Sequence, residues 1–439
     1  MNLLFILYNI LEIKNGVSNK YIEFIKYLES SPLLHNISII MTEINHRSNE
    51  QDNFHNQHDF QRAKLYYVKG CKVPFYDKIK IPNINHELLD VIIKNQNYII
   101  LFNGEFIWLY NRLLKFKENH CSSLLLFPTW HTDYESYFQK YINFSNNKNH
   151  VSYLMKELRI NLEKKYFQGM VVTGGYMEDK FKKYSEHVFN ANELCASNFK
   201  TCKIDSYQEK SVLHFIYCGR VSIEKNIDEL FELLENFKMN PFEIHIIGNG
   251  PYLKTLQEKY PPENNKTGNK NNFFQVHYYG EVDYSKIQNI YQKLDNRIFI
   301  MCSETETFGK APMEAGLTGI PIFIKQSKNI QFMYNNENAF IFENKFDFIN
   351  QLLFFLKMNK KHRETWIVHS IQNIRQYDQS IIFPNWEEFL NCQWSSILNH
   401  DFQEGNIRKS IENSGEDVKK SKIRHLFHMM QCSMDVFST

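Results

Sequence analysis

The sequence predicts an α/β protein with two domains, each built around a sheet of parallel strands. Short apolar runs alternate with segments of helical composition through both halves of the chain. The length of 439 residues fits two large α/β domains. The composition, 43% hydrophobic and 23% charged, is that of a globular protein with a substantial core.

The first predicted strand is the apolar run Leu3–Tyr8 near the start of the chain. A loop follows that contains Gly16, and residues 20–28 have apolar side chains at helical spacing. On the residues alone, Gly16 is an ordinary turn glycine. Further strands in this half are expected at residues 99–102, 122–127 and 169–175.

His131 comes shortly after the strand predicted at residues 122–127. A histidine beyond the carboxyl end of a parallel strand can face a cleft between domains, because ligands of open α/β sheets bind at that edge. Most histidines instead lie on the surface or satisfy a local hydrogen bond. Its position therefore makes His131 a candidate site residue.

The second half opens with an apolar strand that ends at Gly219. Arg220 and Lys225 follow in the connection to the next helix, where two cations can neutralise a diphosphate. Lone basic residues are otherwise solvated surface charges. The next strands are expected at residues 244–247, followed by the turn at Gly248, and at residues 276–280.

The apolar run Arg297–Met301 predicts a buried strand, followed by a loop and a helix that ends near Gly319. Phe308 and Gly309 form the turn before the helix, and a helix start binds anions through its free N–H groups. Glu314 lies about two turns into this helix, so its carboxylate could accept both hydroxyls of a ribose while Glu306 meets a sugar. The competing interpretation is two glutamates on a solvated helix.

These motifs resemble the donor-site signature of family 4 glycosyltransferases. The resemblance lies in Glu-x-Phe-Gly followed by Glu-Ala-x-x-x-Gly-x-Pro from Glu306 to Pro321, and in Gly-Arg-x-x-x-x-Lys-Asn from Gly219 to Asn226. The segment 131–137 is similar to the branch that contains sulfoquinovosyl and GDP-mannose-dependent mannosyl transferases. The resemblance implies the GT-B fold, in which two Rossmann-like domains face each other across a cleft.

The same resemblance implies a role for each matched residue. Arg220 and Lys225 would stabilise the departing diphosphate, Glu306 would orient the hexose hydroxyls, and His131 would touch the sugar from the opposite domain. The other expected donor contacts are Gly16, Gly219, Gly248, Phe308, Gly309 and Glu314, the last of them on the ribose.

The implied activity is transfer of a hexose from a nucleoside diphosphate sugar to an acceptor hydroxyl, with retention. The acceptor would be a glycan, a lipid or another hydroxyl compound. No cofactor or divalent metal is expected, because no Asp-x-Asp motif lies beside the strands. Three alternatives remain open: a nucleotide-sugar epimerase, a phosphorylase with pyridoxal phosphate, and a non-catalytic binding protein.

Four segments are expected along the chain: an acceptor-side domain (1–205), a donor-binding domain (206–382), a helix that crosses back to the first domain (383–399) and a charged, amphipathic tail (400–439).

Charge and cysteine content restrict the partners and the location of the protein. The net charge of +2 gives no basic field for nucleic acid. Eight scattered cysteines are expected to be reduced, and no cysteine or histidine cluster has zinc spacing. No apolar run approaches the roughly 18 residues of a membrane span. The chain is therefore expected to be cytoplasmic, or at most peripheral on a membrane.

Overall fold

The computed structural model describes residues 1–13, 16–34, 36–43, 60–73, 76–94, 96–104, 107–119, 124–131, 167–194, 199–201, 207, 211–235, 237, 239–262, 274–303, 306–327, 330–331 and 333–400. The chain divides into two compact units, Met1–Phe127 with Glu387–Thr439, and Pro128–Trp386. The predicted domain boundary at residue 205 falls outside the described residues and stays a prediction.

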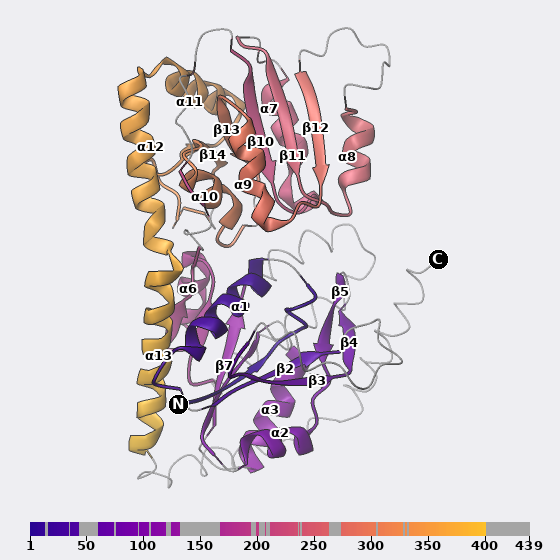
Figure 1. Cartoon of the computed structure of the whole chain (residues 1–439), viewed down its shortest axis with the longest axis vertical. Helices are drawn as coiled ribbons and strands as arrows, with labels where there is room; N and C mark the ends of the chain where they lie inside the picture. The colour runs from indigo at the N-terminus through magenta and orange to yellow at the C-terminus, as the bar shows by residue number, and fades with distance from the viewer. Residues whose placement is uncertain are drawn as a thin grey trace. The chain divides into compact units, whose positions relative to one another are not determined.

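A seven-stranded sheet forms the first half of the fold, in the order β3-β2-β1-β6-β7-β8-β9 (Figure 1). Strand β1 lies between β2 and β6 and is parallel to both, with Leu3 opposite Ile37 and Ile99. All five residues of β1 are buried, as expected for a central strand covered on both faces. The strands are β1 Asn2–Ile6, β2 Asn36–Thr42, β3 Lys64–Val68, β6 Tyr98–Asn103, β7 Leu124–Trp130, β8 Met170–Val172 and β9 Val188–Asn190.

Helix α1 (Gly16–Glu29) follows β1 and buries one apolar stripe. Tyr21 and Phe24 of this stripe pack edge-on against Phe5, at 6.2 and 6.5 Å between ring centroids. The helix begins four residues before its predicted start at residue 20, so Gly16 is its first residue rather than part of a loop. The other elements of this half are α2 His86–Ile93, α3 Ile107–Asn119, α6 Gly175–Lys182 and the hairpin β4 Gly70–Val73 with β5 Tyr76–Pro82.

The second sheet has six parallel strands in the order β12-β11-β10-β13-β14-β15 (Figure 1). The strand order reverses between β10 and β13, which makes the carboxyl ends of these two strands the topological switch point of the sheet. The strands predicted in this half are confirmed. They are β10 Leu213–Cys218, β11 Phe242–Ile247, β12 Phe274–Gly280, β13 Arg297–Met301, β14 Ile322–Lys325 and β15 Phe340–Phe342.

Helices cover both faces of this second sheet. Alternate strand residues point to opposite faces, so Phe215 packs in the core with α7, α8 and α11, while Ile216 packs in the core with α9, α10 and α12. The predicted parallel α/β arrangement is confirmed here. The helices are α7 Ile227–Leu234, α8 Leu253–Lys259, α9 Tyr284–Lys293, α10 Lys310–Leu317, α11 Lys345–Lys357 and α12 Lys360–Ile374.

The last described element is the long helix α13 (Gln379–His400), which contains residues of both units. Trp386 is fully buried and stacks on Phe189 at 6.1 Å, and three residues further on Phe389 meets Phe127 edge-on at 5.8 Å. A crossing helix was predicted over residues 383–399, and the observed helix begins four residues earlier. The tail beyond His400 lies outside the described residues.

No helix in the described part of the chain is both long enough and apolar enough to cross a bilayer.

Candidate functional site

The switch point of the six-stranded sheet brings together two residues that the sequence singled out. Lys225 follows β10 and Glu306 follows β13, 81 residues later in the chain. The Lys225 Nζ donates to Glu306 Oε2 at 2.5 Å, and both side chains are about one-fifth exposed, at 22% and 20%. Because the ammonium carries three donors, it can hold Glu306 and a phosphate oxygen together.

The connection after β10 holds Lys225 in a short, braced turn. A 3₁₀ turn spans Ile223–Lys225, and Asn226 has a left-handed conformation (φ 50°) before α7 begins. The buried Ser222 hydroxyl donates to the Glu224 carboxylate at 2.6 Å. This buried contact fixes the backbone around Lys225, so the amine extends from a rigid base.

Gly219 and Gly248 let the ends of β10 and β11 approach each other closely. Gly248 has φ +141°, and a Cβ there would lie 1.8 Å from the carbonyl oxygen of Gly219. Glycine is therefore required at position 248 by the backbone itself. Arg220 follows Gly219 and is partly exposed, and its carbonyl accepts the Tyr217 hydroxyl at 2.7 Å.

Phe308 and Gly309 form the turn before helix α10. Gly309 is the N-cap and has φ +69°, and its carbonyl accepts the Tyr334 hydroxyl at 2.6 Å. A Cβ at this position would approach Glu306 Cγ at 3.3 Å, so the glycine leaves room for that side chain. The Phe308 side chain is buried and packs edge-on against Tyr377 at 5.4 Å. Phe308 thus anchors the loop in the core, and only its main chain is placed to meet a ligand.

Glu314 lies on α10 and is 6% exposed. Its Oε1 accepts the Tyr284 hydroxyl at 2.7 Å, which leaves Oε2 for a ligand. Burial raises the pKa of Glu314 above its usual value, and the Lys310 ammonium and the Tyr284 hydroxyl offset part of that rise. Lys310 is itself held by Glu193, Nζ to Oε1 at 2.8 Å.

His131 and Gly16 each follow a strand of the seven-stranded sheet. His131 directly follows β7, is 6% exposed, and its Nδ1 lies 3.2 Å from the Thr173 hydroxyl. Within the unit Pro128–Trp386, the Thr307 hydroxyl donates to the main-chain oxygen of His131 at 2.9 Å, so the loop of Glu306 adjoins this histidine. Gly16 is exposed at the start of α1, after β1.

Two residues near strand ends were not predicted from the sequence. Tyr284 begins α9 after β12, and its hydroxyl donates to Glu314. Its position after the carboxyl end of a strand could have marked it as a candidate site residue. Asn103 ends β6 next to β1 and is 4% exposed, and its Oδ1 has no hydrogen-bond partner among the described residues. A buried unpaired oxygen at a strand end is a candidate contact for a bound hydroxyl.

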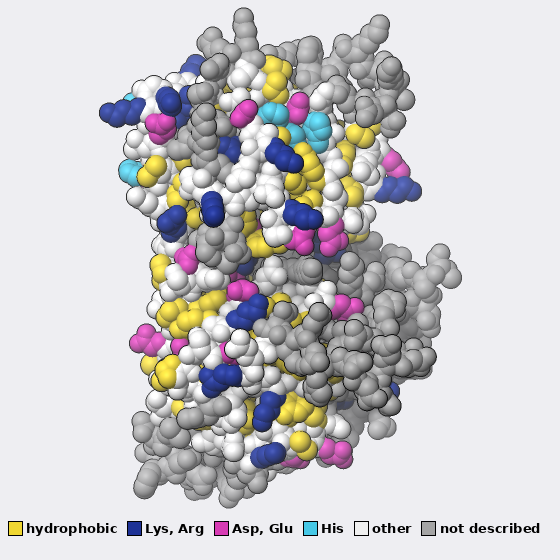
Figure 2. Space-filling view, in the orientation of Figure 1, with side chains coloured by type: hydrophobic (Ala, Val, Ile, Leu, Met, Phe, Trp, Pro, Cys, Tyr) yellow, Lys and Arg dark blue, Asp and Glu magenta, His cyan; other side chains and the backbone are white. Residues whose placement is uncertain are grey.

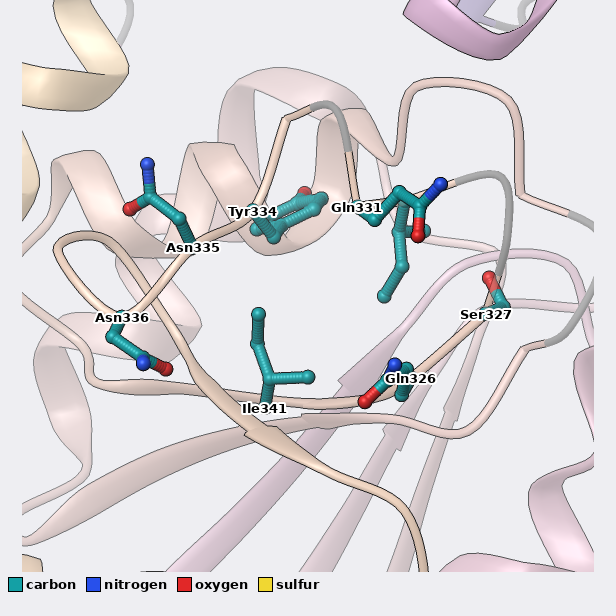
Figure 3. A pocket seen from close by; sticks show the side chains of 8 residues that line it. Gln326, Ser327, Gln331, Tyr334, Asn335, Asn336 and Ile341 are labelled. Carbon is teal, nitrogen blue, oxygen red and sulfur yellow. The ribbon is translucent and has the colours of Figure 1, made fainter.

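A separate pocket of about 250 Å³ lies beyond β14 (Figure 3). Tyr334 lines it and also binds the Gly309 carbonyl, which connects the pocket wall to the turn before α10. None of the described predicted site residues lines this pocket. The lining side chains are Gln326, Ser327, Ile330, Gln331, Tyr334, Asn335, Asn336 and Ile341.

The chain resembles known proteins most clearly in the part that carries the switch point. Residues 206–371 match the family Glycosyl transferases group 1. This segment contains Arg220, Lys225, Glu306 and Glu314, but neither His131 nor Gly16. A curated relative, described as an uncharacterized 41.2 kDa protein in the cps region of Klebsiella pneumoniae, is 24% identical over 151 residues. That alignment covers 34% of this chain and 38% of the relative.

Several solved structures share the fold over most of the chain. The apo form of the lipopolysaccharide outer core galactosyltransferase WaaB has a TM-score of 0.60 at 14% identity, covering 90% of this chain and all of WaaB. Sucrose-phosphate synthase from Thermosynechococcus elongatus has a TM-score of 0.64 at 14% identity, covering 90% of this chain and 99% of the synthase. Anabaena HepE in complex with UDP has a TM-score of 0.60 at 12% identity, covering 89% and 100%. These similarities confirm the predicted α/β fold of the GT-B type.

Proposed function

We propose that this protein is a glycosyltransferase that moves a hexose from a nucleoside diphosphate sugar to an acceptor hydroxyl. The observation that carries the proposal is the meeting of Lys225 and Glu306 at the switch point between β10 and β13. Parallel α/β sheets bind ligands at this point. The match of residues 206–371 to group 1 glycosyltransferases supports the same activity.

The two basic residues after β10 serve the leaving group. Transfer forms a bond from the acceptor oxygen to the anomeric carbon and breaks the bond from that carbon to the diphosphate. The charge that develops on the departing phosphate is stabilised by Lys225 and Arg220. The same phosphate oxygen takes the acceptor's proton, so no separate enzymic base is required, and the anomeric configuration is retained.

The acidic residues and His131 position the donor. Glu314 accepts ribose hydroxyls through the carboxylate oxygen that Tyr284 leaves available. Glu306 orients the hexose hydroxyls, and His131 contacts the sugar. Gly16, Gly219, Gly248 and the Phe308–Gly309 turn bring main-chain N–H groups to the donor; correct placement of this kind is a large part of enzymic rate enhancement.

Neither a cofactor nor a catalytic metal ion takes part in this proposal, because lysine and arginine supply the positive charge at the diphosphate. The acceptor is a glycan, a lipid or another hydroxyl compound. UDP is the first nucleotide to test, since HepE has been crystallised with UDP and with UDP and glucose.

A thermal-shift panel of UDP-, GDP- and ADP-hexoses tests donor binding. A ligand at 100 times its dissociation constant stabilises the fold by about 2.7 kcal/mol. We expect one nucleotide class to raise the Tm of the wild type, and the shift to shrink in Lys225→Ala. A panel without any shift would contradict the proposal.

Product analysis with the stabilising donor distinguishes the alternatives. Transfer to an added acceptor with release of nucleoside diphosphate supports the proposal. Conversion to an isomeric nucleotide sugar without an acceptor identifies an epimerase. Donor binding without any product on a panel of acceptors identifies a binding protein.

A further inference from the structure

A cluster of histidines lies on the six-stranded sheet, between the amino-terminal ends and the middle of its strands. His214 is the second residue of β10, and in the parallel register it is opposite Glu243 of β11. His245, two residues after Glu243, is opposite His277 of β12. The site of Lys225 lies beyond the carboxyl ends of the strands. The histidine cluster is therefore separate from it and lies nearer to the amino ends. Histidine side chains are visible together over β10 to β12 in Figure 2.

The strand pattern directs these side chains to one face. Residues two apart on a strand share a face, so Glu243 and His245 lie side by side. His214 lies on the same side as Ile216, which packs in the core with α9 and α10. Three ligand-type side chains from two strands therefore converge.

The distances within the cluster fit a tetrahedral metal ion. His214 Nδ1 lies 3.5 Å and His245 Nε2 lies 3.6 Å from Glu243 Oε2, and the two nitrogens are 2.9 Å apart. Zinc bonds of about 2.0–2.2 Å in a tetrahedron separate ligand atoms by about 3.3–3.6 Å. Two of the three separations have this value already, and the third must open by only about 0.4 Å.

Two neighbouring side chains, Tyr279 and His277, orient His245 and Glu243. A ligating histidine usually donates its other ring N–H to a fixed acceptor, and Tyr279 Oη lies 3.0 Å from His245 Nδ1. Glu243 Oε2 lies 3.0 Å from His277 Nε2, which orients the carboxylate in the same way. These contacts would be expected of an outer shell around a metal.

His245 is the most deeply buried member of the cluster, and its side chain is 2% exposed. The basic residue opposite His214 in the parallel register is Arg297 of β13. Its guanidinium donates to the Tyr291 carbonyl at 3.1 Å, so this cation is held by the main chain.

We propose that His214, His245 and Glu243 bind a zinc ion that links strand β10 to strand β11, toward the amino-terminal ends of the strands. Two histidines and one glutamate are an established zinc ligand set, and they leave a fourth position for water. The His214 and Glu243 side chains are 16% and 26% exposed, so an ion reaches the site from solvent. On binding, each imidazole carries its proton on the ring nitrogen away from the ion, His214 on Nε2 and His245 on Nδ1, and His245 then donates from Nδ1 to Tyr279.

Zinc titration of the chelator-treated, full-length chain tests this site. We expect one tight equivalent by calorimetry, a higher Tm with zinc, and visible absorption typical of four-coordinate cobalt when Co²⁺ replaces zinc. His214→Gln and Glu243→Gln should each weaken zinc binding at least about 100-fold, since outer-shell changes alone cost 10- to 100-fold. Both residues are partly exposed, so these variants should fold, and circular dichroism checks that they do.

His369→Gln is the matched control, because this histidine is exposed on α12 and outside the cluster. Its zinc titration should equal that of the wild type. Wild-type titration in His214→Gln and Glu243→Gln, or loss of tight binding in His369→Gln, would show adventitious zinc only and overturn the proposal. Since none of the three ligands belongs to the proposed transfer site, transferase activity is read separately.

Discussion

The two ends of the six-stranded sheet carry different polar groups. At the carboxyl ends, Lys225 and Glu306 form a charged pair that stays one-fifth exposed. Toward the amino ends, His214 and Glu243 lie beside His245, whose side chain is almost fully buried. The first arrangement keeps charges ready for an anionic ligand, whereas the second has nitrogen lone pairs for a cation.

The difference follows from how each end is built. The carboxyl-end residues lie on the connections after the strands, where glycines such as Gly248 allow close backbone approach. The amino-end residues lie within the strands and are held by the register of the sheet. A ligand at the first end would therefore meet side chains on braced connections between strand and helix, and a metal at the second would join two strands of one sheet.

The largest expected effect is that of Lys225→Ala on transfer. Loss of a charge that acts on the leaving phosphate should lower kcat about 100-fold or more, while zinc binding remains unchanged. Steady-state kinetics with the donor found in the panel measures this effect. Lys259→Ala, which removes an exposed lysine paired with Asp228, is the control and should retain wild-type kcat. Near-normal turnover in Lys225→Ala would remove the charge-stabilising role.

Glu314→Gln should have an intermediate effect, with donor affinity reduced about 30-fold by the loss of a charge-assisted hydrogen bond worth about 2 kcal/mol. The folded-state pKa of Glu314 is raised, so its ionisation costs stability, and that cost develops as pH rises through the unfolded and then the folded pKa. Glu314→Gln should therefore keep or raise the Tm at neutral pH. In the wild type, donor affinity should fall on acidification at a higher pH than an ordinary glutamate would give. An unchanged affinity, or a pH profile shared with Glu314→Gln, would contradict ribose binding.

The smallest effect is expected for Tyr279→Phe, which removes only the hydroxyl next to His245 Nδ1. Zinc affinity should fall about 10-fold, the lower limit for an outer-shell partner, and kcat should not change. Calorimetry of Tyr279→Phe beside the wild type measures the difference. Tyr278→Phe provides the comparison, since the Tyr278 hydroxyl donates to Tyr260 on the opposite face and should not affect zinc. Equal zinc affinity in both variants would show that Tyr279 does not orient the ligand.

The elements of the second sheet were predicted well because each strand is a short apolar run with a glycine or polar turn after it. The run Arg297–Met301 is observed with the predicted bounds. The start of α1 was placed too late, because the polar residues of its first turn lack the apolar spacing that marks a helix. The donor contact expected of Phe308 stays a prediction; its side chain is buried against Tyr377, a packing contact that the local motif did not reveal.

Lys225, Glu306 and Glu314 could be selected as candidates from local order alone, since each is placed by a strand, a turn and a helix that follow one another in the chain. The histidine cluster could not, because His214 and His245 are 31 residues apart and share no motif. This separation in the chain is also why the sequence has no zinc-like spacing in this region. Only the pairing of parallel strands sets which residues are opposite, and that pairing depends on the packing of helices on both faces of the sheet. Tertiary structure therefore determined the histidine cluster, whereas the order of residues in the chain was sufficient to select Lys225, Glu306 and Glu314 as candidates.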